Sequence, residues 1–400
     1  MTVTSTGRVR HRIALDPAVP RAHAEEFSRR VFFVSEDILR FDLVGGETIT
    51  ALDVEVAGTA DVPALSRKLS QVITHDVLAR QPHREQLVWS SEPGRPAVDV
   101  FDELVARGAA VTMGEGLVAF GEPMLALTDY LDSRIRAMVR EEFRAVEYRY
   151  PTLISTEVMR RCGYFSSFPQ LMMFVSRLHA DVDVYNDFLA GLTAGEDLSG
   201  LLRERSARVE QCLPPTMCFH TFAQLADSRL APGPAVMTSR GKSFRHESRY
   251  QRSLERLWDF TIREIVFLGS RDQVLARRAR LMEMTYALAG ELGLGGRCEV
   301  ANDPFFISAD AGERVWSQRL LQLKYELRMP LDHERDVAVC SFNYHEKFFA
   351  GSFGITAADG GDVHTACAGF GLERFAYAFL CRHGLDPAGW PADVRRAVLS

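Results

Sequence analysis

Arginines and carboxylates crowd one stretch of the chain, residues 243–269, which reads SFRHESRYQRSLERLWDFTIREIVFLG. Arg245 and Glu247 are two residues apart, so on a strand they share a face. Arg256 falls in the loop of the expected hairpin and Arg263 on its returning strand. Guanidinium groups bind phosphate oxygens in pairs, so a convergence of these arginines suits a triphosphate. The alternative is a solvated hairpin with surface ion pairs.

A second stretch, HTACAGFGLERFAYAFL at residues 364–380, joins an expected strand to an aromatic helix. Gly369 and Gly371 let the backbone pass close to a ligand, and Arg374 at the helix start can face an anion. The alternative is an ordinary tight turn between a strand and a helix.

The cysteines are odd in number, scattered and never arranged as C-x-x-C. A disulfide framework is therefore not expected, and each thiol is either a metal ligand or a small buried apolar group. The seven are Cys162, Cys212, Cys218, Cys298, Cys340, Cys367 and Cys381.

The composition is that of a large globular protein: 400 residues with a net charge of −6, 46% hydrophobic and 25% charged. No apolar run approaches the ~18 residues that a membrane span needs. The first residues, MTVTSTGRVRHRIALD, lack the apolar segment of a secretory signal. We therefore expect a cytoplasmic protein with no membrane partner, and the acidic balance disfavours nucleic acid.

The first part of the chain, residues 1–110, predicts a small α+β domain. Strands are expected in RHRIAL, ILRFDLVG, TALDVEVAG and EQLVWSS, and helices in RAHAEEFSRRVFFV and VPALSRKLSQVITHDVLAR. This order suits a sheet with helices on one face. The stretch at residues 90–99, rich in Pro, Gly and Ser, is the expected connection.

The second part, residues 111–400, predicts an antiparallel sheet flanked by helices. A long helix is expected in MLALTDYLDSRIRAMVREEF, and helices again at residues 271–292 and 311–329. Strands are expected in TMCFHTF, KSFRHES, LWDFTIREIVFLG, DVAVCSFNY and GSFGITAA.

Three motifs resemble those of class II aminoacyl-tRNA synthetases, in the order found in that class. The helix ending at Phe143, followed by EYRYPTLI, resembles the dimer-forming motif 1. F-R-x-E with its arginine-bearing loop and second strand resembles motif 2, and GFGLER resembles motif 3. The resemblance implies an ATP-dependent, adenylate-forming enzyme that is a homodimer.

Further segments narrow the resemblance, among them CGYFSSFPQL, SFNYHEKFF and ACAGFGLER. Together they look like the amino acid:[carrier protein] ligases, relatives of methanogen-type seryl-tRNA synthetases. That family holds Zn²⁺ with Cys, Glu and Cys, and the matching positions here are Cys218, on an expected strand, Glu264 and Cys367. Two thiolates and a carboxylate leave one zinc position open, which can take an α-amino group.

The resemblance also implies roles in binding ATP and the amino acid. Arg245 is expected to hold the α-phosphate and the substrate carboxylate, where charge develops during attack. Glu247 is expected to contact the adenine and Phe260 to stack on it. Arg256 and Arg374 are expected to hold the outer phosphates.

Two further residues align with less distinctive positions. Asp336 matches an acidic Mg²⁺ ligand of class II sites, with a surface carboxylate as the alternative. Asn343 is a candidate for contact with the substrate or metal, with a turn-capping asparagine as the alternative.

The acceptor of the activated amino acid is expected to be the phosphopantetheine thiol of a carrier protein. Carrier proteins present acidic helices, and the expected helix at 311–329, with Arg314, Arg319, Lys324 and Arg328, is a basic docking candidate. tRNA is not expected, because the front domain is not basic. A seryl-type tRNA synthetase and a non-catalytic synthetase paralogue remain the alternatives.

Overall fold

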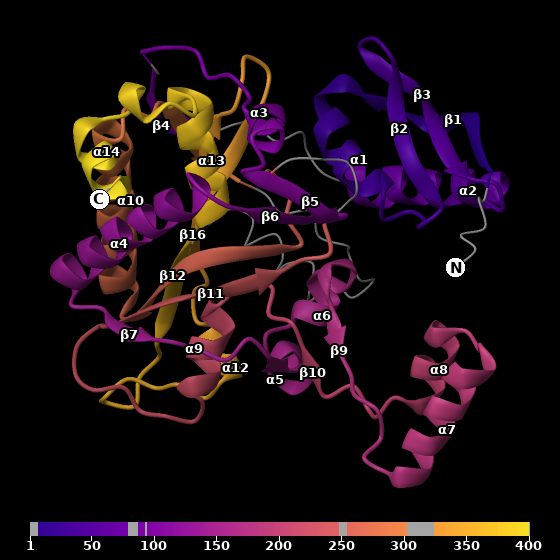
Figure 1. Ribbon diagram of the computed structural model, residues 1–400. Coiled ribbons are helices and arrows are strands. Elements are labelled where there is room, and N and C mark those ends of the chain that lie inside the picture. The colour runs from indigo at the N-terminus through magenta and orange to yellow at the C-terminus, as the bar shows by residue number, and fades with distance from the viewer. Residues whose placement is uncertain (1–6, 79–86, 93, 248–253, 302–323, 400) are drawn as a thin grey trace.

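The structure of the chain is a computed structural model, which describes residues 7–78, 87–92, 94–247, 254–301 and 324–399. Figure 1 shows a small N-terminal unit beside a larger one, and a helical hairpin that projects from the larger unit.

The N-terminal unit is a three-stranded antiparallel sheet, in the order β1-β3-β2, with helices on one face. Leu52, Val54 and Val56 alternate along β3 and share a buried core with Leu65 and Leu69 of α2. The elements are β1 (Arg8–Pro20), a 3-10 turn (Arg21–His23), α1 (Ala24–Val31), β2 (Ile38–Gly45), β3 (Thr48–Ala57), α2 (Val62–Val72) and a π-helical turn (Ile73–Val77).

The large unit is built on an eight-stranded sheet in the order β4-β13-β14-β15-β16-β12-β11-β7. Every pair is antiparallel except β11 with β7. The strands are β4 (Leu87–Ser91), β7 (Val146–Tyr148), β11 (Ala235–Phe244), β12 (Asp259–Gly269), β13 (Gly296–Val300), β14 (Lys324–Pro330), β15 (Asp336–Tyr344) and β16 (His364–Gly371). The antiparallel α+β architecture predicted from the sequence is confirmed.

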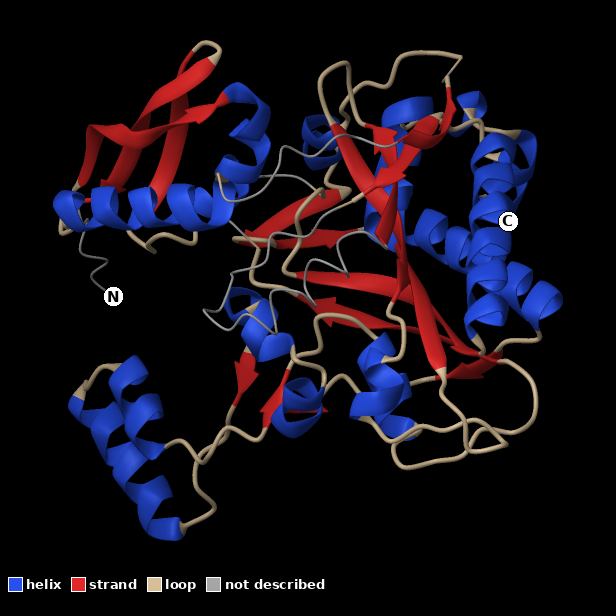
Figure 2. Cartoon of the chain, turned by 180° about the vertical axis from the view of Figure 1, so that it is seen from behind, coloured by secondary structure: helices blue, strands red, loops and turns tan. Residues whose placement is uncertain are grey.

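Helices cover the two faces of this sheet differently, as Figure 2 shows from behind. Long helices bury one face, where Leu131, Leu281 and Phe375 pack against Ile265 and Phe267. Those helices are α4 (Met124–Phe143), α10 (Arg271–Glu291) and α13 (Leu372–His383). The other face carries short helices and the candidate site; the helices there are α5 (Thr156–Arg161), α6 (Tyr164–Ser167), α9 (Cys218–Gln224) and α12 (Phe348–Ser352).

The remaining elements lie at the margins of the large unit. The helices are α3 (Phe101–Ala106) and α14 (Ala392–Val398), with 3-10 turns at Pro169–Leu171 and Pro387–Gly389. A two-stranded sheet pairs β5 (Ala110–Gly114) with β6 (Leu117–Phe120), and a three-stranded one joins β8 (Ile154–Ser155), β10 (Gln211–Cys212) and β9 (Phe174–Val175).

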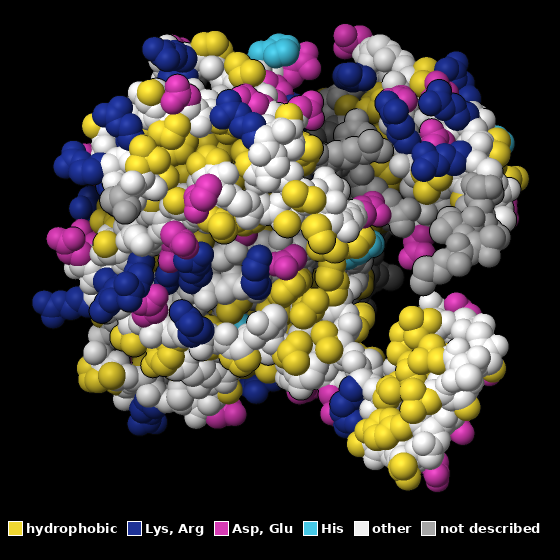
Figure 3. Space-filling model, viewed as in Figure 1, with side chains coloured by type: hydrophobic (Ala, Val, Ile, Leu, Met, Phe, Trp, Pro, Cys, Tyr) yellow, Lys and Arg dark blue, Asp and Glu magenta, His cyan; other side chains and the backbone are white. Residues whose placement is uncertain are grey.

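The projecting hairpin consists of α7 (Val182–Ala194) and α8 (Leu198–Arg205). Asp181 caps α7 and Gly195 ends it in the left-handed conformation. An apolar stripe runs along the hairpin in the space-filling view of Figure 3. Tyr185, Leu189 and Leu192 are among its exposed side chains.

The segment after the N-terminal unit differs from expectation. The strand expected in EQLVWSS is present as β4, but it pairs with β13 at the edge of the large sheet rather than with the N-terminal strands. Val100 and Leu104 also pack in the large core. We therefore propose that the boundary between the units lies between Leu78 and Leu87 instead of near residue 110.

Three further secondary-structure predictions are wrong. The strand expected in GSFGITAA is absent, because Gly351 and Ser352 end α12 and Thr356 makes only an isolated bridge with Arg229. The segment TMCFHTF, expected to be a strand, contains the start of α9, whose residues from Cys218 to Phe222 are all buried. The expected helix at 311–329 ends in a strand, β14, in which Leu327 and Met329 alternate into the core. The rest of that expected helix, including Arg314 and Arg319, lies outside the described residues.

Candidate metal and nucleotide site

Three potential metal ligands converge on the sheet face opposite the long helices. One ligand atom from each of Cys218, Glu264 and Cys367 lies within 4.8 Å of the others, and all three residues are buried. Glu264 and Cys367 come from the neighbouring strands β12 and β16, while Cys218 begins α9. The structure thus brings together the three residues that the family resemblance selected.

The surroundings favour the neutral form of each of these groups. Burial raises the pKa of Glu264 to about 7 and also raises the pKa of the Cys218 thiol. A hydrogen bond with Cys218, together with burial, raises the pKa of the Cys367 thiol well above its usual value. A bound cation would reverse this preference, because metal ligands are deprotonated.

One oxygen of Glu264 supports a metal at this position. The Thr216 hydroxyl donates to Glu264 Oε2 at 2.6 Å. Glu264 Oε1 is buried and has no hydrogen-bond partner of normal geometry among the described residues, although the Cys367 thiol and the Met217 backbone also interact with the carboxylate. An unpaired buried carboxylate oxygen is costly unless something else pairs with it. A metal ion between Oε1 and the two sulfurs fits this arrangement.

Asn343, the predicted substrate contact, lies beside the cysteine of β16. Its Nδ2 is 3.5 Å from Cys367 Sγ and 3.3 Å from Ser341 Oγ. His345 Nε2 is also 3.5 Å from this sulfur. The sequence reasoning did not single out His345 or Thr216, although both lie within three residues of predicted site residues.

The arginines of motifs 2 and 3 gather next to this cluster. Arg245 follows β11 directly, and its Nε donates to the Pro215 carbonyl at 3.0 Å. Arg374 is partly buried at the start of α13, and its Nε donates to the Glu255 carbonyl at 2.7 Å. The side chain of Arg256 lies 3.6 Å from Glu247 Oε2.

Electrostatic coupling shows that these groups share one region. Burial, and next the charge of Arg256, lower the pKa of Arg374 to about 9, and Arg245 acts in the same direction. Glu247 and Glu326 partly offset this effect. A guanidinium whose charge is disfavoured by burial and by like charges gains most from a bound anion, so the arrangement suits phosphate groups.

Phe260 and Gly369 shape the space between the arginines and the metal ligands. The Arg245 guanidinium lies 5.5 Å from the centre of the Phe260 ring. Phe260 and Glu264 are on one face of β12, because they are an even number of residues apart. A Cβ on Gly369 would lie 2.7 Å from Ile262 Cδ1 and 3.6 Å from Glu264 Oε2. Only glycine therefore fits at position 369 without displacing its neighbours.

Two predicted phosphate or magnesium contacts have other partners. Arg263 was expected among the triphosphate-binding arginines, and this is wrong. It points to the opposite face of β12 from Glu264, where its guanidinium binds Asp132 at 2.7 and 2.8 Å. Asp336 accepts from Arg328 at 2.7 Å and pairs with Arg297 at 2.5 Å, so each of its oxygens already has an arginine partner.

The predicted docking residues Lys324 and Arg328 are also engaged within the sheet. Lys324 lies 2.9 Å from Glu326, and Arg328 pairs with Glu326 and Asp336. These two positions therefore do not form part of an exposed basic helix.

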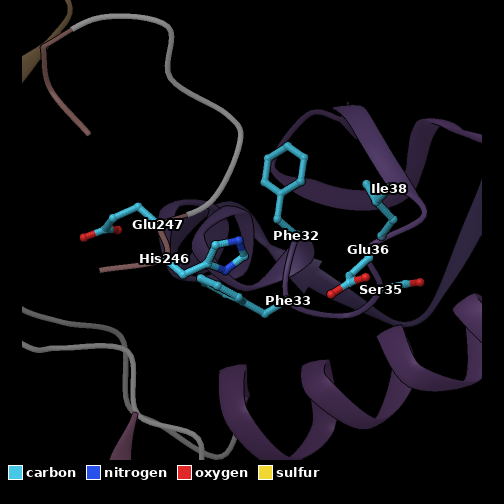
Figure 4. Close-up of a pocket in the computed structure, with 7 residues that line it drawn as sticks. All are labelled: Phe32, Phe33, Ser35, Glu36, Ile38, His246 and Glu247. Carbon is cyan, nitrogen blue, oxygen red and sulfur yellow. The ribbon is translucent and has the colours of Figure 1, made fainter. Parts of the chain in front are cut away.

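The N-terminal unit borders the end of motif 2. Phe33 and Glu36 of that unit line a shallow hollow together with His246 and Glu247 (Figure 4). Glu247, the predicted adenine contact, therefore lies where the two units meet. No helix in the described part of the chain is long and apolar enough to span a bilayer.

Solved structures define the fold class. The chain matches Methanopyrus kandleri seryl-tRNA synthetase, crystallised with Aquifex aeolicus tRNASec, with a TM-score of 0.73 and 23% identity, over 98% of this chain and 77% of that one. It also matches a cytoplasmic serine–tRNA ligase from Naegleria fowleri with a TM-score of 0.59 and 11% identity, over 79% and 71% of the two chains. The fold is that of a class II aminoacyl-tRNA synthetase. No protein-family profile matches the chain.

Sequence relatives define the family. The chain is 34% identical to amino acid–[acyl-carrier-protein] ligase 1 of Bradyrhizobium diazoefficiens over 68% of its length and 82% of the relative. It is 37% identical to ligase 2 of the same organism, over 68% and 80%. A type-2 serine–tRNA ligase of Methanopyrus kandleri is 27% identical over 75% of this chain and 60% of that protein. The chain belongs to the amino acid–[acyl-carrier-protein] ligase family, which confirms the resemblance found in the motifs.

Proposed function

We propose that this ligase activates an amino acid with ATP and transfers it to the phosphopantetheine thiol of a carrier protein. The observation that carries the proposal is the convergence of Cys218, Glu264 and Cys367 beside the arginines of motifs 2 and 3. The names of the two Bradyrhizobium relatives support the carrier protein as acceptor.

The metal is proposed to be Zn²⁺, held by the two thiolates and the carboxylate. This donor set suits zinc, and Glu264 Oε1 has no hydrogen-bond partner of normal geometry among the described residues. With three protein ligands, a bound zinc ion keeps one position for the α-amino group of the substrate. We infer that the substrate passes close to Gly369, because a Cβ at that position would lie only 3.6 Å from Glu264 Oε2.

The arginines are proposed to bind and orient ATP. Arg245 faces the α-phosphate and the attacking carboxylate, while Arg256 and Arg374 hold the outer phosphates. A carboxylate oxygen of the amino acid forms a bond to the α-phosphorus as the bond to the bridging oxygen breaks, and pyrophosphate leaves. Fixed guanidiniums stabilise the charge that develops on the phosphoryl oxygens. We infer that Mg²⁺ enters with ATP, with Asp336 as its proposed protein ligand.

The second step transfers the acyl group to sulfur. The thiol of the carrier arm gives its proton to water and attacks, as the thiolate, the carbonyl carbon of the adenylate. AMP leaves with the electrons of the broken C–O bond. The product is a thioester. No basic docking helix is available among residues 324–330, so the docking proposal now rests on residues outside the described ranges.

A homodimer is proposed from the outer edge of the large sheet. β7 is the last strand, and Val146 and Tyr148 on it are 53% and 37% exposed. An edge strand with exposed apolar side chains can pair with another copy. Size-exclusion chromatography with light scattering tests this proposal.

Pyrophosphate exchange into ATP, measured with each common amino acid, tests the first step. Mass spectrometry of holo and apo carrier proteins tests the second, because only the holo form has the thiol. Exchange followed by a mass gain on the holo carrier alone supports the proposal. If none of the amino acids supports exchange, the protein is a non-catalytic paralogue.

Serine–tRNA ligase activity is the second candidate. The solved Methanopyrus synthetase matches 98% of this chain, so the N-terminal unit is included in the match. Charging of tRNA with serine, with holo carriers left unmodified, would establish this activity instead.

A further inference from the structure

The two cysteines of the candidate metal site have different hydrogen-bonding neighbours. Cys367 Sγ is 3.5 Å from Asn343 Nδ2 and 3.5 Å from His345 Nε2. Both nitrogens belong to β15 or to the residue that follows it, and Asn343 is the cross-strand partner of Cys367. Because β15 and β16 are neighbours in one sheet, these donors are held firmly against the sulfur.

The ring of His345 is held by a hydrogen bond and by two aromatic neighbours. Its Nδ1 lies 3.2 Å from Thr365 Oγ1, and its backbone N–H donates to the Thr365 carbonyl at 2.9 Å. Phe222 and Phe349 pack edge-on to the ring. His345 is only 7% exposed and Thr365 is fully buried, so the neutral ring is favoured. When the Thr365 hydroxyl donates to Nδ1, the single ring N–H is at Nε2 and faces Cys367.

Cys218 has no comparable donor among the described residues. Apart from Cys367 and Glu264, the other two members of the site, the polar group beside its sulfur in the described part of the chain is Thr216 Oγ1, at 3.9 Å. That hydroxyl has one proton, and Glu264 Oε2 accepts it at 2.6 Å. A Cys218 thiolate therefore receives no hydrogen bond from Thr216.

We propose that His345 is a positioning residue that makes the two thiolates unequal, by donating from Nε2 to Cys367 Sγ when the metal is bound. This inference rests on the zinc site of the proposed function. Hydrogen bonds withdraw electron density from a thiolate, so Cys367 donates less charge to the metal than Cys218 does. The bound cation stays more electrophilic toward the substrate amino group, and the orientation of Cys367 is fixed.

The test uses the full-length protein with cobalt(II) in place of zinc. The energy of the thiolate-to-cobalt charge-transfer absorption band depends on the electron density on sulfur. His345→Leu removes the N–H donor and is expected to shift this band to longer wavelength. His345→Gln retains an N–H donor and is expected to keep the band near its wild-type position. His364→Gln, which alters a neighbouring histidine whose ring faces Tyr344, is the matched control and is expected to leave the band unchanged.

The outcomes separate this inference from the proposed function. Purified wild-type protein that binds neither zinc nor cobalt overturns the metal site itself. Wild-type protein that binds cobalt, with the same band in His345→Leu, overturns only the role of His345. If His345→Leu does not fold, Thr365→Val decides, because it removes the hydroxyl that fixes the ring. A shift to longer wavelength in that variant supports the proposal, and an unchanged band overturns it.

Discussion

The buried pair between Arg263 and Asp132 ties the candidate site to the long helix behind the sheet. Arg263 lies on β12, next to Glu264 but on the opposite face, and its side chain is 2% exposed. It binds Asp132 of α4 through two hydrogen bonds and Glu147 of β7 through a third, at 3.0 Å. The same strand thus carries a metal-ligand candidate on one face and its anchor on the other.

Arg263→Met is expected to destabilise the large unit by about 3–5 kcal/mol, because it leaves Asp132 buried without its main partner. Arg240→Met is the matched control. Arg240 is the cross-strand neighbour of Arg263, but it is 38% exposed and pairs mainly with Asp129 at 2.7 Å. An exposed pair of this kind contributes roughly 0–1 kcal/mol.

Urea unfolding followed by fluorescence measures both variants. With a denaturant dependence of about 3 kcal/mol per molar urea, Arg263→Met lowers the midpoint by roughly 1–2 M. Combining Arg263→Met with Asp132→Leu is expected to recover much of the loss, because the buried charge is then removed as well. If the Arg263 and Arg240 variants unfold at the same urea concentration, the anchoring argument is wrong.

Three further predictions concern the candidate site. Cys367→Ala is expected to lose zinc by elemental analysis and to abolish pyrophosphate exchange, whereas Cys381→Ala, in the large core, keeps both; zinc retained by the first variant would contradict the ligand assignment. Arg374→Ala is expected to slow exchange by roughly 10- to 150-fold, because a hydrogen bond to a charged group contributes about 1.5–3 kcal/mol, and a wild-type rate would exclude Arg374 from phosphate binding. Zinc retention against a chelator is expected to improve as pH rises from 6 to 8, because the raised pKa values of Glu264 and both thiols mean that protons compete with the metal; retention independent of pH would indicate other ligands.

The sequence predicted the site better than it predicted which elements lie next to one another. The motif resemblance selected Cys218, Glu264 and Cys367, although each comes from a different element and no local spacing links them. Their partners His345 and Thr216 were missed, because a hydrogen bond to a ligand leaves no pattern of its own in the chain.

The errors have separate physical causes. Five consecutive residues of α9, Cys218 to Phe222, are buried, so this stretch lacks the amphipathic period that marks a helix. In β14, Leu327 and Met329 are two residues apart, and an apolar side chain at every second position is the pattern of a strand. That pattern was overlooked. Arg263 was wrongly included among the triphosphate-binding arginines. Successive side chains on a strand point to opposite faces, so Arg263 and Glu264 cannot both face the site.

The position of β4 bears on how this chain can be shortened. The indole of Trp89 stacks on Tyr286 of α10 with ring centres 4.5 Å apart, and β4 shields the outer edge of β13. A truncation that begins at residue 111 would remove β4 and leave the edge of β13 open to pairing with other molecules. It would also remove Trp89, so the ring of Tyr286 would lose its stacking partner. One that begins before Leu87 keeps both, so a stable fragment of the large unit includes the residues from Leu87 onward and not only those from residue 111.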